Sequence, residues 1–400
     1  MITPPPHRSI RGTPLWLGLG VVVLLSGCSG ELSRTTAESG ATPFVFRALN
    51  LRQQDLLGRP TWTLTSPEAR YDIDSRIARS TEPRGTIFRD GQPAYRLSAD
   101  SGIVVNDGAL VLLEGDIRLE QLGAQPLLIQ ARRARWLPAR NLLELDHRPE
   151  AFDGSNRITA RRARYLFDQE ELRLLNAPRV EHWSQRIDPF HPQKRGKPEI
   201  VLQVRSASWF PRSGRLESNG PLRAWRLAPA APQTTAANLK SSDQTLTAAA
   251  LFGNTREQRF TLTGPVKLLD PSQDLTLLAR QISIDLPARV IRTTMPATEQ
   301  PSGLPADAGC LVRQRGDSLQ ARQCQWNWDS QIVIAQGAVQ LRRQDHQQLT
   351  RGSLLIGTLG AEGRFRLSNP GGRVISRFAA PARPAQAPAP PRPAPEPIRL

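Results

Sequence analysis

The sequence predicts an all-β protein, an elongated antiparallel structure built of stacked repeats of roughly 30 residues. Apolar and polar residues alternate with a period of two, as in Tyr95–Ala99 and Ile117–Leu119, which is typical of strands with one buried face. Between them, Asn106-Asp107-Gly108 supplies residues that tolerate positive φ where a hairpin reverses. Similar units recur from about residue 60 to residue 370. Because one unit cannot bury its own apolar face and stacked copies can, the repeats favour one continuous stack.

Residues 1–28 are arranged like a secretory signal peptide. Basic residues precede the apolar run Leu15–Leu25, which is too short to span a bilayer. The run ends in Leu25-Ser26-Gly27-Cys28, which resembles the lipobox of bacterial lipoproteins. Cys28 is therefore the predicted lipidation site, and the mature chain is expected outside the cytoplasm. An ordinary signal peptide, or an uncleaved anchor, with a chance cysteine is the alternative.

The remaining chain divides by composition and by the recurrence of the repeat. The two most similar strings, Ala131–Trp136 and Ala160–Tyr165, are offset by 29 residues, within the range of stacked supersecondary units. A stretch with three prolines and several basic residues interrupts the pattern, and the end of the chain is rich in Pro and Ala, which favours an extended chain without a fold. The predicted divisions are a tether at 29–43, a β domain at 44–183, a loop or seam at 184–199, a second β domain at 200–378 and a disordered tail at 379–400.

The formal net charge is +17, and nearly all of the excess comes from arginine. In a cytosolic chain this excess would point first to nucleic acid. The secretory N-terminus argues against that, so we expect no nucleic-acid partner.

Cys310 and Cys324 flank Gly316-Asp317-Ser318. If those three residues form a hairpin loop, the two cysteines lie opposite each other, and an oxidising compartment permits a cross-strand disulfide. Two unpaired, small apolar side chains are the alternative.

No arrangement of residues indicates catalysis. The five histidines are not spaced for a metal site or a dyad, and neither HExxH, GxSxG nor a phosphate-binding Gly-Lys-Ser/Thr loop occurs. We therefore expect no enzyme activity, no metal and no cofactor. A carbohydrate-active enzyme remains an alternative, because glycosidase carboxylates are dispersed in sequence.

Two groups of residues suggest binding. Tryptophans such as Trp62 and Trp136 lie on repeat strands, where they pack in a core or line an apolar groove between the faces of a folded-over sheet. Arginines cluster at matching positions of neighbouring repeats, where they form either a cationic rim for phosphate or carboxylate groups or a solvated face. The candidate rim residues are Arg132, Arg133, Arg161 and Arg162.

The repeats resemble the OstA-like repeat of the lipopolysaccharide-transport proteins, and the resemblance covers most of residues 44–374. Together with Trp62-Thr63-Leu64-Thr65 and the membrane-anchored N-terminus, it is closest to the LptC family. The copies that support it best are Ala69–Asp72, Leu112–Leu119, Ala163–Asp168 with Leu174–Val180, and Leu262–Leu268.

The resemblance implies an open, folded-over antiparallel β-jellyroll, here two stacked jellyrolls, whose interior holds the acyl chains of lipid A. It also implies unpaired end strands that pair with the periplasmic β domains of an ABC transporter upstream and with an LptA-like bridge or outer-membrane translocon downstream. The chain is then expected in the periplasm, lipid-anchored, in the inner membrane rather than the outer. The expected lipid-groove residues are Trp62, Leu64, Leu97, Ile117, Leu119, Ile129 and Trp136.

Three features depart from the family: a lipobox where better-known members keep a transmembrane helix, about twice the usual length, and a Pro-rich tail. The extra length resembles a second jellyroll of the bridge-protein type. The alternative function is a structural envelope lipoprotein whose basic face binds peptidoglycan or surface polysaccharide.

Overall fold

The computed structural model describes residues 44–124, 127–185, 188, 196–227, 244–295, 304, 308–344, 347–359 and 363–378. The predicted signal peptide, Cys28, the tether and the Pro-rich tail lie outside the described residues. Within the described part, strands joined by turns and two short 3-10 helices make up the fold, and no helix is long and apolar enough to cross a membrane. The predicted all-β, antiparallel fold is confirmed.

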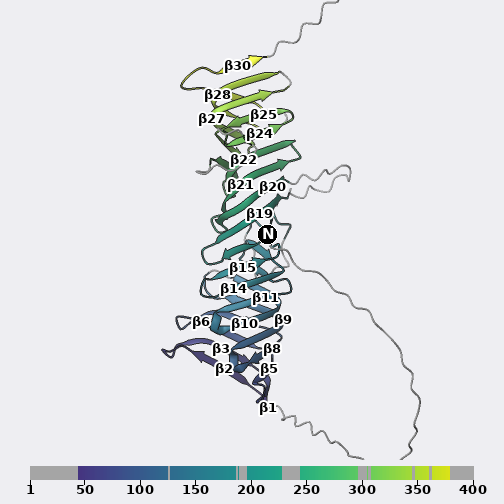
Figure 1. Ribbon diagram of the computed structural model, residues 1–400, viewed down its shortest axis with the longest axis vertical. Coiled ribbons are helices and arrows are strands. Elements are labelled where there is room, and N and C mark those ends of the chain that lie inside the picture. Colours follow the sequence, from purple (N-terminus) through teal and green to yellow (C-terminus); the bar gives the residue numbers. More distant parts are fainter. Residues whose placement is uncertain are drawn as a thin grey trace, which may run out of the picture. The chain divides into compact units, whose positions relative to one another are not determined.

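The strands belong to one antiparallel sheet, which Figure 1 shows from β1 to β30. In the first half the elements are β1 (Phe44–Phe46), β2 (Leu49–Gln54), β3 (Pro60–Ser66), β4 (Glu68–Asp72), β5 (Ile77–Thr81), β6 (Arg84–Arg89), β7 (Gln92–Ser98), β8 (Ser101–Val105), η1 (Asn106–Gly108), β9 (Leu110–Gln121), β10 (Leu127–Leu137), η2 (Pro138–Arg140), β11 (Leu142–Asp146), β12 (Glu150–Phe152), β13 (Asn156–Thr159), β14 (Arg162–Leu166), β15 (Glu171–Leu175) and β16 (Arg179–His182). In the second half they are β17 (Ile200–Val204), β18 (Ala207–Phe210), β19 (Arg215–Arg226), β20 (Gln244–Asn254), β21 (Arg259–Asp270), β22 (Leu275–Asp285), β23 (Val290–Thr294), β24 (Cys310–Gln314), β25 (Asp317–Ala321), β26 (Gln323–Asn327), β27 (Ile332–Arg343), β28 (Gln348–Thr358), β29 (Phe365–Ser368) and β30 (Ile375–Phe378).

The sheet is folded lengthwise into two layers, which the strand pairings define. Layer 1 contains the short strands β1, β4, β5, β8, β11, β14, β15, β18, β23, β26 and β29. Layer 2 contains β2, β3, β6, β7, β12, β13, β16, β17, β24, β25 and β30. The long strands β9, β10, β19, β20, β21, β22, β27 and β28 pair in both layers and pass from one to the other.

The chain changes layer at corners, which lie on one side of the sheet, whereas hairpin turns end both layers on the other side, here called the turn side. On β9 the corner is Gly115, with φ 101°, where an added Cβ would lie 2.2 Å from the Asp100 side chain. On β21 it is Gly264, with φ 90° and only 2.4 Å to Ala249 Cβ. Only glycine fits such positions without strain. At Gly115 and Gly264 the corner is therefore a bend within one long strand, and the strand continues in the other layer.

The ladder of hydrogen bonds continues across the interruption at 184–199. β15 pairs with β18 in layer 1, and β16 pairs with β17 in layer 2. The interruption is therefore a long connection on the turn side, and the two halves of the chain share one sheet.

The apolar side chains of both layers face each other and form the core. Inward positions of layer 1 lie directly opposite one another on consecutive strands, and aromatic residues alternate with leucine. The row reads Trp136, Leu143, Tyr165, Leu172, Trp209 and Leu216, and each is at most 2% exposed. The offset of 29 residues thus separates Trp136 from Tyr165, which occupy the same inward row.

Candidate binding interior and sheet edges

The seven residues expected to line a lipid groove all lie in the interior between the layers. None is more than 6% exposed. Leu97, Leu119 and Ile129 lie side by side on layer 2, on β7, β9 and β10. Trp62 of layer 2 meets Trp136 of layer 1 edge-to-face, with ring centroids 5.2 Å apart. In this structure the side chains of the two layers fill the interior themselves.

An aromatic cluster joins the layers near the turn side of the first half. The hydroxyl groups of Tyr95, in layer 2, and Tyr165, in layer 1, lie 3.1 Å apart. The ring of Phe167 packs edge-to-face on both, with centroids 5.2 and 5.1 Å away. Burial raises the pKa of Tyr165 well above its ordinary value, so its hydroxyl stays protonated and able to donate.

An ion-pair network lies beside the aromatic cluster and also connects the layers. Arg89, at the end of β6, pairs with Glu170, in the β14–β15 turn, and donates a 2.6 Å hydrogen bond to the Phe167 carbonyl oxygen. Arg212 approaches the same carboxylate at 2.9 Å. We call Arg89, Glu170 and Arg212 the latch. The latch could not be predicted, because no local sequence motif links positions so far apart in the chain.

A cleft of about 670 Å³ opens on the turn side next to the latch. The turns that follow β2, β6, β8 and β10 line it, and Trp62, Tyr95 and Trp136 contribute to its inner wall. Polar turn residues at the mouth and aromatic rings at the base make this cleft a point where an amphipathic ligand could reach the interior.

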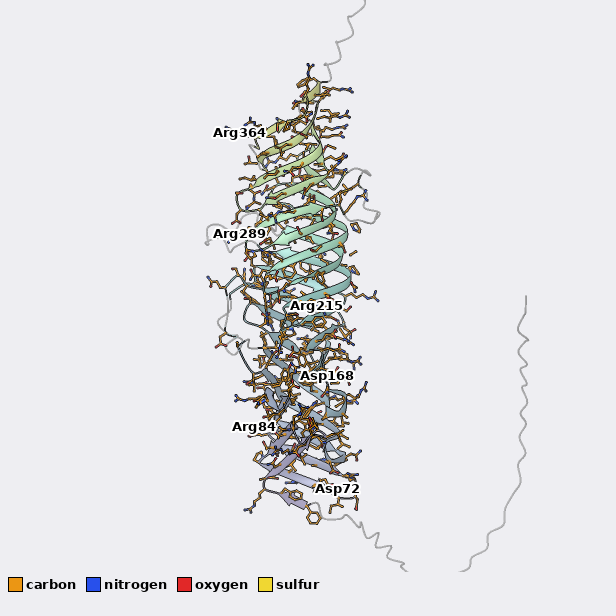
Figure 2. The ribbon with its side chains drawn as sticks, turned by 90° about the vertical axis from the view of Figure 1, so that its left-hand side faces the viewer. Asp72, Arg84, Asp168, Arg215, Arg289 and Arg364 are labelled. Atoms are coloured by element: carbon orange, nitrogen blue, oxygen red, sulfur yellow. A yellow bond between two sulfur atoms is a disulfide. The ribbon has the colours of Figure 1, made fainter. Side chains whose placement is uncertain are left out.

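The four arginines expected at a groove rim lie elsewhere. Arg132 and Arg161 are at the corners of layer change, on the side opposite the turns. Arg133 and Arg162 point outward from layer 1, where they pair with Glu114 at 3.1 Å and Asp146 at 2.7 Å. All four arginines come directly after a layer 2 segment, at the point where the chain passes into layer 1. They therefore lie at a corner or on the outer face beside it, and none of them borders the turn side. Exposed arginines such as Arg84, Arg215 and Arg364 continue along the sheet (Figure 2).

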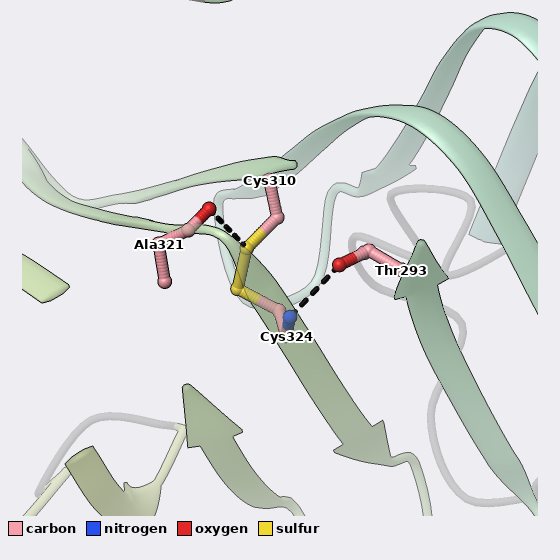
Figure 3. The surroundings of a disulfide bond; sticks show 4 residues. All are labelled: Thr293, Cys310, Ala321 and Cys324. Atoms are coloured by element: carbon pink, nitrogen blue, oxygen red, sulfur yellow. Dashed lines mark hydrogen bonds between the residues drawn. A yellow bond between two sulfur atoms is a disulfide. The ribbon is translucent and has the colours of Figure 1, made fainter. Parts of the chain in front are cut away.

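The structure contains a disulfide between Cys310 and Cys324, but in a different setting from the predicted cross-strand pair. Cys310 lies opposite Ala321, because the β24–β25 hairpin turns at Arg315-Gly316. The chain then turns a corner, so Cys324 lies on β26 in layer 1 while Cys310 lies on β24 in layer 2. The bond therefore crosses the interior and joins the layers (Figure 3). The Cys324 N–H donates to Thr293 Oγ1 at 2.8 Å.

Both ends of the described sheet are unpaired strand edges. At one end, β1 and β2 each pair on one side only, and Phe44 is 56% exposed. At the other, β29 and β30 do the same, and Phe378 is 65% exposed. Such edges present backbone groups that can pair with a strand of another chain.

No group of three or more His, Cys, Asp or Glu residues that could hold a metal ion occurs among the residues that the structure describes. Residues 16–182 match the family model described as lipopolysaccharide-assembly, LptC-related. Over these residues the chain is similar to the LptC family. The match ends at the last residue of β16, so the LptC-related part and the rest of the sheet meet at the long connection.

A comparison with curated proteins found no match. Among solved structures, the chain is similar to LptH from Pseudomonas aeruginosa, described as the LptA homologous periplasmic component of the conserved lipopolysaccharide transport device. The alignment covers 48% of this chain and 94% of that chain, with 12% sequence identity and a TM-score of 0.21.

Proposed function

We propose that this chain is a membrane-anchored periplasmic component of lipopolysaccharide transport. It accepts the acyl chains of lipid A between its two layers, from the periplasmic β domains of an ABC transporter, and passes them to a downstream bridge protein. The LptC-related first half supports the pathway. The mode of binding is supported by the interior, where the inward apolar side chains of both layers form one continuous cluster from β3 to β28.

Loading requires the layers to separate on the turn side, because covalent corners join them on the other. Acyl chains then replace the contacts that the two layers make with each other. Each buried CH₂ group contributes about 0.8 kcal/mol, so several acyl chains together can offset the loss of those contacts. The polar headgroup remains at the turn side, in contact with the polar mouth of the 670 Å³ cleft.

The unpaired edges serve the transfer. β1 and β2 pair with the transporter's β domain, and β29 and β30 pair with the downstream protein, so that one continuous sheet connects the partners. The membrane anchor is Cys28, by its place in the predicted lipobox.

The interior is tested by photo-crosslinking in cells. A photoreactive residue at Leu97 should capture lipopolysaccharide, whereas one at the neighbouring outward position Arg96 should not. Aspartate at Leu64, Ile117 or Ile129 should abolish capture, because an unpaired charge in an apolar interior is unfavourable, and Arg118→Asp on the outer face should not. Capture at Arg96 equal to that at Leu97, or capture that survives all three substitutions, would overturn the interior assignment.

The edges are tested in the same cells. Photoreactive residues within 44–51 should capture the transporter, and those within 367–374 the downstream protein. Capture of neither would refute the transfer model. Co-purification of glycan instead of lipid A with the membrane-anchored chain would favour the structural lipoprotein.

A further inference from the structure

The arginines at the end of the chain lack the carboxylates that accompany arginines at its beginning. Residues 44–182 contain 21 arginines and 19 Asp or Glu residues, whereas residues 290–378 contain 11 arginines and 6. In the first range, outward arginines such as Arg133 and Arg162 face carboxylates on neighbouring strands. In the last range, only Asp317 and Asp329 belong to the described residues.

Part of this excess surrounds a cleft of about 700 Å³ on the turn side of layer 2. The β24–β25 turn, the end of β27 with Gln344, the start of β28 with Gln347, and the start of β22 line it. Its arginines are Arg313, Arg315, Arg342 and Arg343, and we call these four the arginine cleft. Arg313 and Arg342 lie in one outward row, separated only by Ser318 on the intervening strand.

Two carboxylates lie among the described lining residues, against four arginines. Asp317 accepts the Gln344 N–H at 2.9 Å and lies 3.6 Å from Arg343. Asp274 has no ion pair within 4.0 Å among the described residues, nor do Arg313, Arg315 and Arg342. Like charges side by side on one face of a sheet destabilise it, and a bound anion would offset this repulsion between Arg313 and Arg342.

We propose that the arginine cleft binds a phosphate-bearing anion. Guanidinium groups donate two parallel hydrogen bonds to phosphate oxygens, and the side-chain amide of Gln344 at the same cleft adds a neutral donor. The phosphate belongs either to the headgroup of an anionic lipid or to a soluble phosphorylated compound. This inference goes beyond the proposed function and does not depend on lipopolysaccharide, because Arg313 and Arg342 lie on the outer face of layer 2, whereas Arg343 takes an inward position at the turn side.

The test uses the full chain in neutral detergent and isothermal titration calorimetry. One arm adds inorganic pyrophosphate, and the other adds mixed micelles with either phosphatidylglycerol or phosphatidylcholine. The variant Arg313→Gln/Arg342→Gln should bind at least about tenfold more weakly, because it removes two charge-assisted contacts. The matched control Arg133→Gln/Arg162→Gln removes two outward arginines of the first half, and its affinity should stay within about twofold of that of the unaltered chain. Binding should also weaken with added salt.

Saturable binding of pyrophosphate that only the cleft variant loses supports a soluble ligand. Binding confined to phosphatidylglycerol micelles, and lost in the same variant, supports a lipid headgroup. No saturable binding of either probe by the unaltered chain, or equal losses in both variants, would overturn the proposal. The variant Arg313→Lys/Arg342→Lys keeps the positive charges but lacks the planar guanidinium groups. Its affinity should lie between that of the unaltered chain and that of Arg313→Gln/Arg342→Gln. Lipopolysaccharide crosslinking from Leu97 should persist in the cleft variant, which separates this site from the proposed transport function.

Discussion

The two halves of the sheet, residues 44–183 and 200–378, share the repeat but hold their layers together by different means. In the first half the layers meet through the aromatic cluster and through the latch. In the second half the Cys310–Cys324 disulfide crosses between them. The repeat thus specifies strands and inward rows, while a few side chains outside the repeat pattern decide how firmly the layers stay together.

This difference has a consequence for opening. Ion pairs and ring contacts break and re-form within the folded protein, so the latch and the aromatic cluster can release the turn side of the first half. The disulfide lies next to the corner at Arg322, so it joins the layers of the second half on the corner side until it is reduced. In the proposed transport function, the first half would admit a ligand at its turn side.

The largest expected effect comes from the aromatic row. Trp136→Ala removes a ring that is 2% exposed and packs on Trp62, so the free energy of unfolding should fall by about 3–5 kcal/mol in urea titration. Hydrogen exchange should accelerate in β3 and in β9 to β11. In the second half, Trp326→Ala should accelerate exchange in β23 to β27 instead. If either variant accelerates hydrogen exchange equally throughout the sheet, the layers of the two halves are not stabilised independently.

The disulfide comes next. Cys310→Ala/Cys324→Ala opens a loop of sequence separation 14 and should lower the unfolding free energy by about 3 kcal/mol. Exchange should accelerate around β24 and β26 and remain unchanged around β7 and β14. Reduction of the unaltered chain serves as the control and should produce the same local change. Faster exchange in the first half would contradict a local role for the bond.

The latch should have a smaller effect, because its arginines are partly exposed. Glu170→Gln removes the carboxylate that Arg89 and Arg212 share, and should lower the unfolding free energy by about 1 kcal/mol. The matched control, Glu114→Gln, breaks an ion pair on the outer face of layer 1 and should change stability by less than about 0.5 kcal/mol. Faster exchange at Tyr95 and Phe167 is expected only in the latch variant, and its absence would show that the latch does not hold the layers.

The smallest expected effect concerns pH. His182, on β16, is 8% exposed and lies 2.9 Å from Asn156 Oδ1 through Nδ1, and burial lowers its pKa. As pH falls below the unfolded value of about 6.5, the unfolded chain binds a proton before the folded chain does, so stability is full above that pH and decreases below it. His182→Gln cannot titrate, and its melting temperature should fall less between about pH 7.5 and about pH 5.5. An equal fall in both proteins would exclude this role for His182.

Much of the fold could be predicted from the sequence because its signals are local. Alternation places Leu97, Ile117 and Leu119 inside, and Asn106–Gly108 reverses the chain where predicted, with Asn106 and Asp107 at positive φ. The positions of the arginines could not be predicted. Whether Arg132 or Arg161 borders an opening depends on where the chain changes layer, and that is a property of the paired strands.

The cysteine pair shows the same limit. The sequence identifies the two partners, but a corner between Ala321 and Gln323 moves Cys324 into the other layer. The latch has no local signal, because Arg89 and Glu170 meet only once the layers face each other. Contacts within a layer follow from the repeat, whereas contacts between layers follow from the folded sheet.

The continuous ladder of paired strands also determines the order in which the sheet unfolds. Each rung bonds only to its immediate neighbours, so stability is close to a sum of rung and neighbour contributions. Terminal rungs have one neighbour instead of two and therefore open first. Unfolding then proceeds from the two ends of the sheet toward its middle, so the strands near β15 to β18 should be the last to exchange their amide hydrogens.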